Sequence, residues 1–149
     1  MNRLLAARMA ASFLVVFATT VQAAGKLSVH DAWIAPGSGD TQASAGYATL
    51  GNSGDEPLRI LSVQSDAFRA ISLMKTVNER GTISAREMID LKILPGATVS
   101  LHEGSMRLML LDPRHPISSG DEVRVVFLLA DGTRVPAIFD VAAAHKSGS

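Results

Sequence analysis

Methionine and histidine side chains are the candidates for metal chemistry in this sequence, because it contains no cysteine and therefore no thiolate ligand or cysteine nucleophile. Between residue 24 and the C-terminal tail, the thioethers are those of Met74, Met88, Met106 and Met109, and the imidazoles are those of His30, His102 and His115. Both groups suit soft or borderline transition-metal ions. Methionine in a β domain is most often core filler, and this is our prediction for Met88 and Met106.

Arrangements typical of catalysis are missing from the sequence. His30-Asp31 and His102-Glu103 place an imidazole next to a carboxylate, but consecutive residues of a strand point to opposite sides. No serine lies in a Gly-x-Ser-x-Gly elbow, and neither a glycine-rich phosphate loop nor a zinc-type histidine pair occurs. We therefore predict that the protein is not an enzyme.

The N-terminus has the pattern of a secretory signal peptide. Arg3 and Arg8 form a short basic region, Met9–Val16 is apolar or small, and Val21-Gln22-Ala23 offers a cleavage site. The apolar run is shorter than the roughly 20 residues that span a membrane. We expect residues 1–23 to be removed and the mature chain to be periplasmic, with no membrane association after cleavage.

Length and charge indicate one domain, which we place at residues 24–143, followed by a disordered tail at 144–149. Removing residues 1–23 from the 149 leaves 126, enough for a single hydrophobic core. Loss of Arg3 and Arg8 changes the formal charge from zero to −2. This balance gives no basic surface typical of nucleic-acid binding, and no large apolar patch is evident, so we expect a monomer.

Short apolar or alternating runs separated by turn residues are typical of an antiparallel β protein. The predicted strands are Lys26–Ile34, Ser44–Leu50, Leu58–Ser65, Ala70–Val77, Thr82–Ile89, Thr98–His102, Met106–Leu110, Glu122–Leu129 and Arg134–Val141. Nine short strands at this spacing predict an all-β fold, either a sandwich or a Greek-key barrel.

The last two predicted strands carry the clearest local signals. Asp131-Gly132 between two apolar runs predicts a hairpin, because glycine accepts the positive φ of a tight turn. Glu122–Leu129 is nearly all apolar, which predicts a central strand buried on both faces. Pro136 lacks an amide hydrogen, so we expect it at a sheet edge or a bulge.

Taken in order along the chain, several short motifs resemble the periplasmic copper chaperones called PCu(A)C. The motifs are Asp31-Ala32-Trp33-Ile34, Ala45–Asn52, Gly54-Asp55, Ile93–Ala97, Gly104–Leu110 and Gly120–Val123. The resemblance covers about residues 26–141 and implies a cupredoxin-like β sandwich. It also implies a role in copper handling, because family members deliver Cu(I) to the copper centres of respiratory oxidases.

The family binds copper through His, ten residues, Met, twenty-one residues, His, one residue, Met. This spacing falls without a gap on Met74, Ala85, Arg107 and Met109. One ligand is therefore kept, one histidine is exchanged for another possible ligand, the methionine Met74, and two are replaced by side chains without a donor for a metal. Arginine remains protonated and has no lone pair to offer.

The substitutions predict that the usual site does not bind copper tightly. Two positive charges about 4 Å apart repel by roughly 4 kcal/mol at an effective dielectric near 20, which corresponds to roughly a thousandfold in affinity. The form of this hypothesis in which metal still binds is a weak Cu(I) site built on Met74 and Met109, with His102 as a third ligand. Its partner would be a copper-accepting oxidase subunit or another periplasmic copper protein.

A second hypothesis is a metal-free exported binding module on the same sandwich. Arg107 would then lie at the rim of a shallow pocket and hold a carboxylate in a bidentate pair. The plain structural alternative for Arg107 is a solvated side chain, or one paired with Glu87 or Glu103.

Overall fold

The computed structural model describes residues 27–37 and 43–142. The predicted signal peptide at 1–23 and the predicted tail at 144–149 lie outside these described residues. The described residues contain no helix that is long and apolar enough to cross a membrane.

Ten strands form from the described residues, nine of them at or close to the predicted positions. They are β1 (Leu27–Ala35), β2 (Ala43–Asn52), β3 (Leu58–Gln64), β4 (Phe68–Glu79), β5 (Thr82–Glu87), β6 (Leu91–Ile93), β7 (Thr98–Leu101), β8 (Met106–Pro113), β9 (Glu122–Leu129) and β10 (Arg134–Val141). The ranges predicted for β9 and β10 are confirmed residue for residue. The three-residue strand β6 was not predicted.

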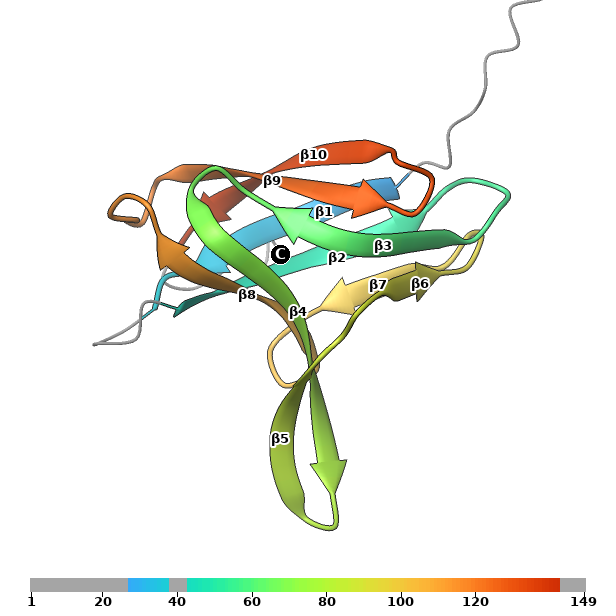
Figure 1. Cartoon of the computed structure of the whole chain (residues 1–149), viewed down its shortest axis with the longest axis horizontal. Coiled ribbons are helices and arrows are strands. Elements are labelled where there is room, and N and C mark those ends of the chain that lie inside the picture. Colours follow the sequence, from blue (N-terminus) through green and yellow to red (C-terminus); the bar gives the residue numbers. More distant parts are fainter. Residues whose placement is uncertain (1–26, 38–42, 143–149) are drawn as a thin grey trace, which may run out of the picture.

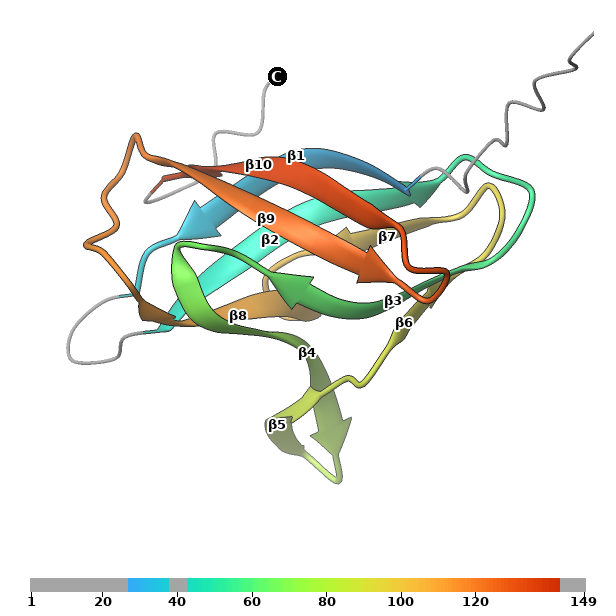
Figure 2. The same cartoon turned by 45° about the horizontal axis from the view of Figure 1, so that its top comes forward.

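The strands form two packed layers, which Figures 1 and 2 show from two directions. One layer runs β5-β4-β8-β2-β1, with β7 also paired to β2, and the other runs β10-β9-β3-β6. A short parallel pairing of β1 with β10 joins them. The predicted all-β sandwich is confirmed. The outer part of the β4–β5 hairpin projects away from both layers (Figure 1).

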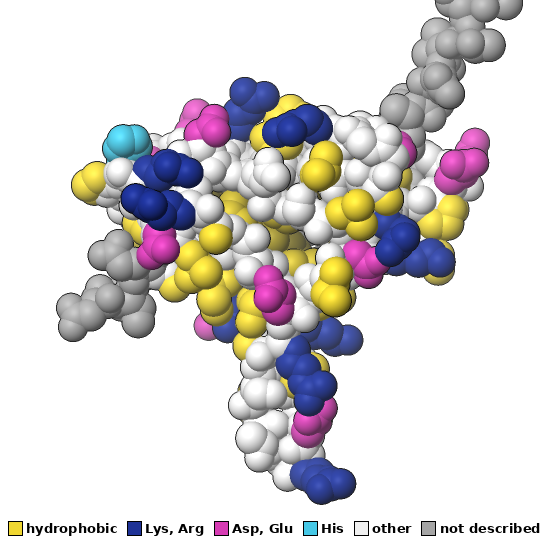
Figure 3. Space-filling model, viewed as in Figure 1, with side chains coloured by type: hydrophobic (Ala, Val, Ile, Leu, Met, Phe, Trp, Pro, Cys, Tyr) yellow, Lys and Arg dark blue, Asp and Glu magenta, His cyan; other side chains and the backbone are white. Residues whose placement is uncertain are grey.

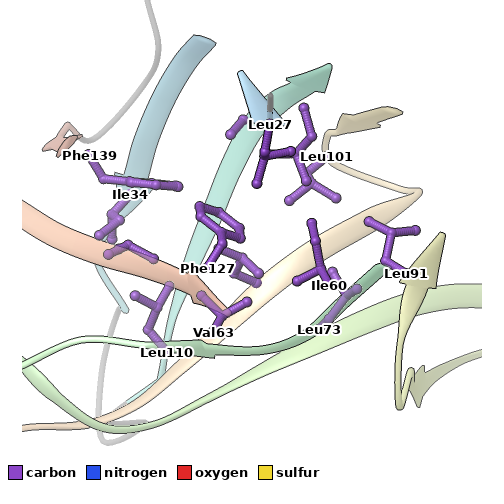
Figure 4. Close-up of a cluster of buried hydrophobic side chains, with 14 of the residues drawn as sticks. Leu27, Ile34, Ile60, Val63, Leu73, Leu91, Leu101, Leu110, Phe127 and Phe139 are labelled. Atoms are coloured by element: carbon purple, nitrogen blue, oxygen red, sulfur yellow. The ribbon is translucent and has the colours of Figure 1, made fainter. Parts of the chain in front are cut away.

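The core lies between the layers and is built from buried side chains of every strand except β5 (Figure 4). Phe127 and Phe139 pack with ring centres 6.4 Å apart. The prediction that β9 is buried on both faces is wrong. Val123, Val125, Phe127 and Leu129 face the core, whereas the other side of β9 carries the exposed Arg124 and half-buried residues. No further layer of the described chain covers that side.

The β9–β10 hairpin closes through Asp131-Gly132, as predicted. Gly132 has φ of 86°, and its amide donates a 3.0 Å hydrogen bond to the carbonyl of Leu129. Pro136 pairs with Val126 of β9, while β10 pairs with β1 only at Asp140 and Val141. Pro136 therefore lies where β10 has a strand on one side only, which agrees with the predicted edge position.

A bulge in β1 determines which of its side chains face the core. The register between β1 and β2 shifts between His30 and Trp33, and Asp31 within the bulge has φ of 50°. One inserted residue reverses the alternation of the residues that follow. As a result Ile34 is fully buried, and Trp33 lies opposite Tyr47 on the outer side of the sheet.

Candidate functional site

Strand β4 is the centre of a three-strand ladder that carries all four motif positions. Arg107 of β8 lies directly opposite Met74, and Met109 lies opposite Ser72. On the other side of β4, Ala85 of β5 lies opposite Thr76. Directly opposed residues, and residues two apart on one strand, share a face of the sheet. The four positions therefore lie on one surface, which we call the motif face.

On the core side of the sheet, β2 has a glycine where it meets β8. A Cβ on Gly46 would lie 3.0 Å from Leu110 and 3.1 Å from Leu108. These two leucines are fully buried and alternate with Arg107 and Met109. The packing of the leucine side of β8 thus fixes the direction of the two motif residues on its other side.

Met74 is flanked by opposite charges. Arg107 lies opposite it on β8, and Glu87 lies opposite it on β5. The Ser72 hydroxyl donates a 2.8 Å hydrogen bond to the Glu87 carboxylate. The position at which the family expects its first histidine is therefore a thioether between a carboxylate and a guanidinium.

Met74 and Met109 are diagonal neighbours on β4 and β8, and both side chains are half-buried. Diagonal positions are about 7–8 Å apart, which long side chains can span. Two thioether sulfurs are chemically suitable for Cu(I). Ala85 is exposed and has no donor atom, and Arg107 carries a fixed positive charge. The motif face therefore offers two metal-donor side chains where the family has four, and it adds the positive charge of Arg107.

The remaining candidate ligands are His102, Met88 and Met106. His102 is exposed in the turn between β7 and β8, where its Nδ1 is 3.0 Å from the carbonyl oxygen of Glu103. Met88 and Met106 pack against the core, as predicted. Within the described residues, no group of three or more histidine, aspartate or glutamate side chains could hold a metal ion.

An aromatic pair borders the motif face and was not assigned to the site from sequence. The rings of Trp33 and Tyr47 are 4.9 Å apart. Tyr47 follows Ala45, which lies opposite Met109, on the same side of β2. Only the β1 bulge brings Trp33 to this side, and the sequence signal for that bulge is a single aspartate that tolerates positive φ.

Two charged side chains, those of Glu103 and Arg107, act on the pKa of Tyr47. Burial raises the pKa of its phenol above 10.0; the Glu103 carboxylate raises the pKa further, and the Arg107 guanidinium lowers it. Two ion pairs join described residues, Arg59–Asp90 and Arg86–Glu79, and neither includes Arg107. The alternative in which Arg107 pairs with Glu87 or Glu103 is therefore wrong.

We expect Arg107→Gln to raise the pKa of Tyr47 and Glu103→Gln to lower it. The phenolate is the charged form, so removing a nearby cation disfavours ionisation and removing a nearby anion favours it. Tyr47 is the single tyrosine of the chain, so phenolate absorbance against pH measures this group alone. Arg59→Gln removes a distant charge and should have no effect. Shifts of the same sign in both variants would contradict the placement of these charges.

Comparison with known proteins gives a family match over most of the described chain. The family described as "Putative lipoprotein LpqE-like" matches residues 27–141. "Uncharacterized protein RP573" of Rickettsia prowazekii is 28% identical over 98 residues, which are 64% of this chain and 54% of that protein. "Putative lipoprotein Lxx21020" of Leifsonia xyli is 28% identical over 117 residues, 77% of this chain and 69% of that protein. The match thus spans about half of the Rickettsia protein and two thirds of the Leifsonia one.

Solved structures show the same fold. The apo PCuAC domain from PmoF1 has a TM-score of 0.66 at 18% identity, covering 80% of this chain and 96% of that domain. The copper-bound PCuAC domain from PmoF2 also has a TM-score of 0.66 at 18% identity, covering 80% and 95%. Cu(I)-DR1885 of Deinococcus radiodurans has a TM-score of 0.65 at 23% identity, covering 85% of each chain. The predicted cupredoxin-like sandwich is confirmed.

Proposed function

The chain belongs to the LpqE-like family, and we propose that it is an exported, copper-chaperone-like protein whose motif face holds Cu(I) only weakly. Copper is its cargo rather than a resident cofactor. The observation that carries the proposal is the register of β4 and β8, which puts Met74 and Met109 on one face with Arg107 directly opposite Met74. Two soft sulfurs beside a fixed cation make a site that can accept and release Cu(I) but not retain it.

Export is supported by the N-terminal pattern and by the relatives described as lipoproteins. None of the 149 residues is a cysteine, so none of them can carry a thioether-linked lipid. We propose that the mature chain starts at residue 24, is periplasmic, and contains one β-sandwich domain over residues 24–143.

Delivery follows from the weakness of the site. A cargo ion leaves most readily for an acceptor with more ligands, such as a copper-accepting oxidase subunit or another periplasmic copper protein. The half-buried thioethers lie on an outer face of the sheet rather than inside the core. An acceptor can therefore approach them without unfolding of the sandwich.

Replacing either sulfur should weaken Cu(I) binding further. We expect micromolar or weaker Cu(I) binding in a competition titration with a chromogenic Cu(I) chelator. Met74→Leu and Met109→Leu should each weaken binding by about tenfold or more, because leucine conserves volume but removes the ligand. Met106→Leu, on the opposite side of β8 against the core, is the matched control. Binding that is unchanged in the Met109→Leu protein would refute a copper site on the motif face.

A metal-free binding module is the second candidate, and the free ion-pairing capacity of Arg107 among the described residues favours it. A guanidinium at a half-buried position can hold a carboxylate through two parallel hydrogen bonds. This candidate predicts that succinate perturbs the Arg107 Nε–H resonance in a metal-free sample. Arg107→Lys should remove the effect, since an ammonium lacks the planar fork. An unperturbed Arg107 resonance would eliminate it.

A further inference from the structure

A separate hollow of about 650 Å³ lies near the start of β4, away from the motif positions in the middle of that strand. It is bordered by the turn between β3 and β4 and by the outer side of the β9–β10 pair. Four arginines line it, namely Arg69, Arg114, Arg124 and Arg134, with Asp66 as the one acidic lining residue. In Figure 3, basic side chains gather over this turn and the start of β9, at the upper left.

The side chains that line this hollow carry a net positive charge. The four guanidinium groups exceed the single lining carboxylate by three charges. Neither of the two ion pairs between described residues involves any of them, because those pairs use Arg59 and Arg86. Guanidinium stays charged at all physiological pH values. Like charges gathered around one concave surface focus a positive potential there and attract anions.

The backbone holds the arginine-bearing segments in fixed positions. The Ser65 hydroxyl donates a 2.6 Å hydrogen bond to the carbonyl of Arg124. The amide of Arg114 donates a 2.8 Å hydrogen bond to the carbonyl of Ala67, and the amide of Ala67 donates to the Ser65 hydroxyl at 3.2 Å. The turn between β3 and β4 therefore joins β9 to the segment after β8. Two of the arginines are positioned by bonds that do not use their side chains.

The exposed lining of the hollow is mostly polar, with a few apolar side chains among the arginines. Val63 and Phe68 line it and are buried, and Val126 and Pro136 line the side formed by β9 and β10. A mostly polar lining that carries several guanidinium groups suits an anionic group. Phosphate groups match several guanidiniums at once, because their oxygens accept bidentate pairs in more than one direction.

From this arrangement we propose that the hollow is a binding site for a phosphate group, carried by a small organic phosphate or by an anionic lipid headgroup. The site does not depend on copper and does not use the motif face. Sequence inspection could not find it, since its arginines are spread from residue 69 to residue 134 and only the fold brings them together.

Titration of the protein with glycerol phosphate, followed by amide chemical shifts, tests the soluble form of the ligand. Co-sedimentation with phosphatidylglycerol vesicles, against phosphatidylcholine vesicles, tests the lipid form. We expect saturable binding in one or both arms, with shifts concentrated at residues 65–69 and 124–126. Binding in the first arm alone identifies a soluble phosphate, and binding in the second alone identifies a headgroup.

The double variant Arg114→Gln/Arg124→Gln should weaken this binding by about tenfold or more. It leaves the backbone hydrogen bonds of both residues in place, and its thermal unfolding midpoint should match that of the unmodified protein. The control Arg59→Gln/Arg86→Gln removes the same charge from the two ion-paired arginines and should retain binding. No binding in either arm, or equal loss in the control, would overturn the proposal.

Discussion

Met74→His/Ala85→Met/Arg107→His should convert the motif face into a tight Cu(I) site, with a dissociation constant at least about a thousandfold lower than that of the unmodified chain. The three changes restore the family's ligands and remove the guanidinium, while Met109 is already present. Each new donor enters a position that the β4 ladder already places on the face of Met109. Imidazole and thioether groups are both well suited to Cu(I).

The measurement is a competition titration with Cu(I) chelators of graded affinity, combined with circular dichroism to verify the fold. Lys75→His/Arg86→Met is the matched control, because Lys75 and Arg86 are opposed on the same hairpin but alternate with Met74 and Ala85. It adds a histidine and a methionine and removes positive charge on the wrong side of the ladder, so copper affinity should stay weak. A folded triple variant that binds no better than this control would show that the motif positions do not form one site.

The secondary structure was readable from the sequence wherever a local signal was strong. Glu122–Leu129 and Arg134–Val141 were predicted to the residue, because the turn at Asp131-Gly132 has a clear physical cause. Strand β6 was not predicted, because three residues are too few to establish an alternation of apolar and polar side chains. The exposed side of β9 was not predicted, because a nearly all-apolar sequence is compatible with a strand that is covered on one face or on both.

The candidate site was readable only in part. The spacing of the motif indicated which residues to compare, and the ladder of β4 with its two neighbours explains why they share a face. Trp33 could not be assigned to that face, because its direction depends on one extra residue in β1. The arginine hollow depends on contacts between segments that are distant in sequence, for which a single sequence gives no signal.

Asn52→Ala should lower the free energy of unfolding by about 2–4 kcal/mol. Asn52 is only 3% exposed, and its side chain joins the β2–β3 turn to the end of β6. Its amide group donates to the carbonyls of Glu56 at 2.7 Å and Ile93 at 3.0 Å. Its side-chain oxygen accepts a 2.9 Å hydrogen bond from the amide of Gly54. Alanine removes all three bonds and leaves their backbone partners in a region too enclosed for full hydration.

Urea denaturation, followed by tryptophan fluorescence, measures the loss as a lower midpoint at unchanged slope. Asn78→Ala is the matched control, since the Asn78 side chain makes one exposed hydrogen bond, at 3.1 Å to the amide of Gly81, and should cost below about 1 kcal/mol. Equal losses in the two variants would mean that the burial of Asn52 adds nothing to the free energy of unfolding. A larger loss at Asn52 would identify this residue, which ends one of the motifs of the family resemblance, as a requirement of the fold. A motif residue that the fold requires can therefore persist in a chain whose copper ligands have been replaced.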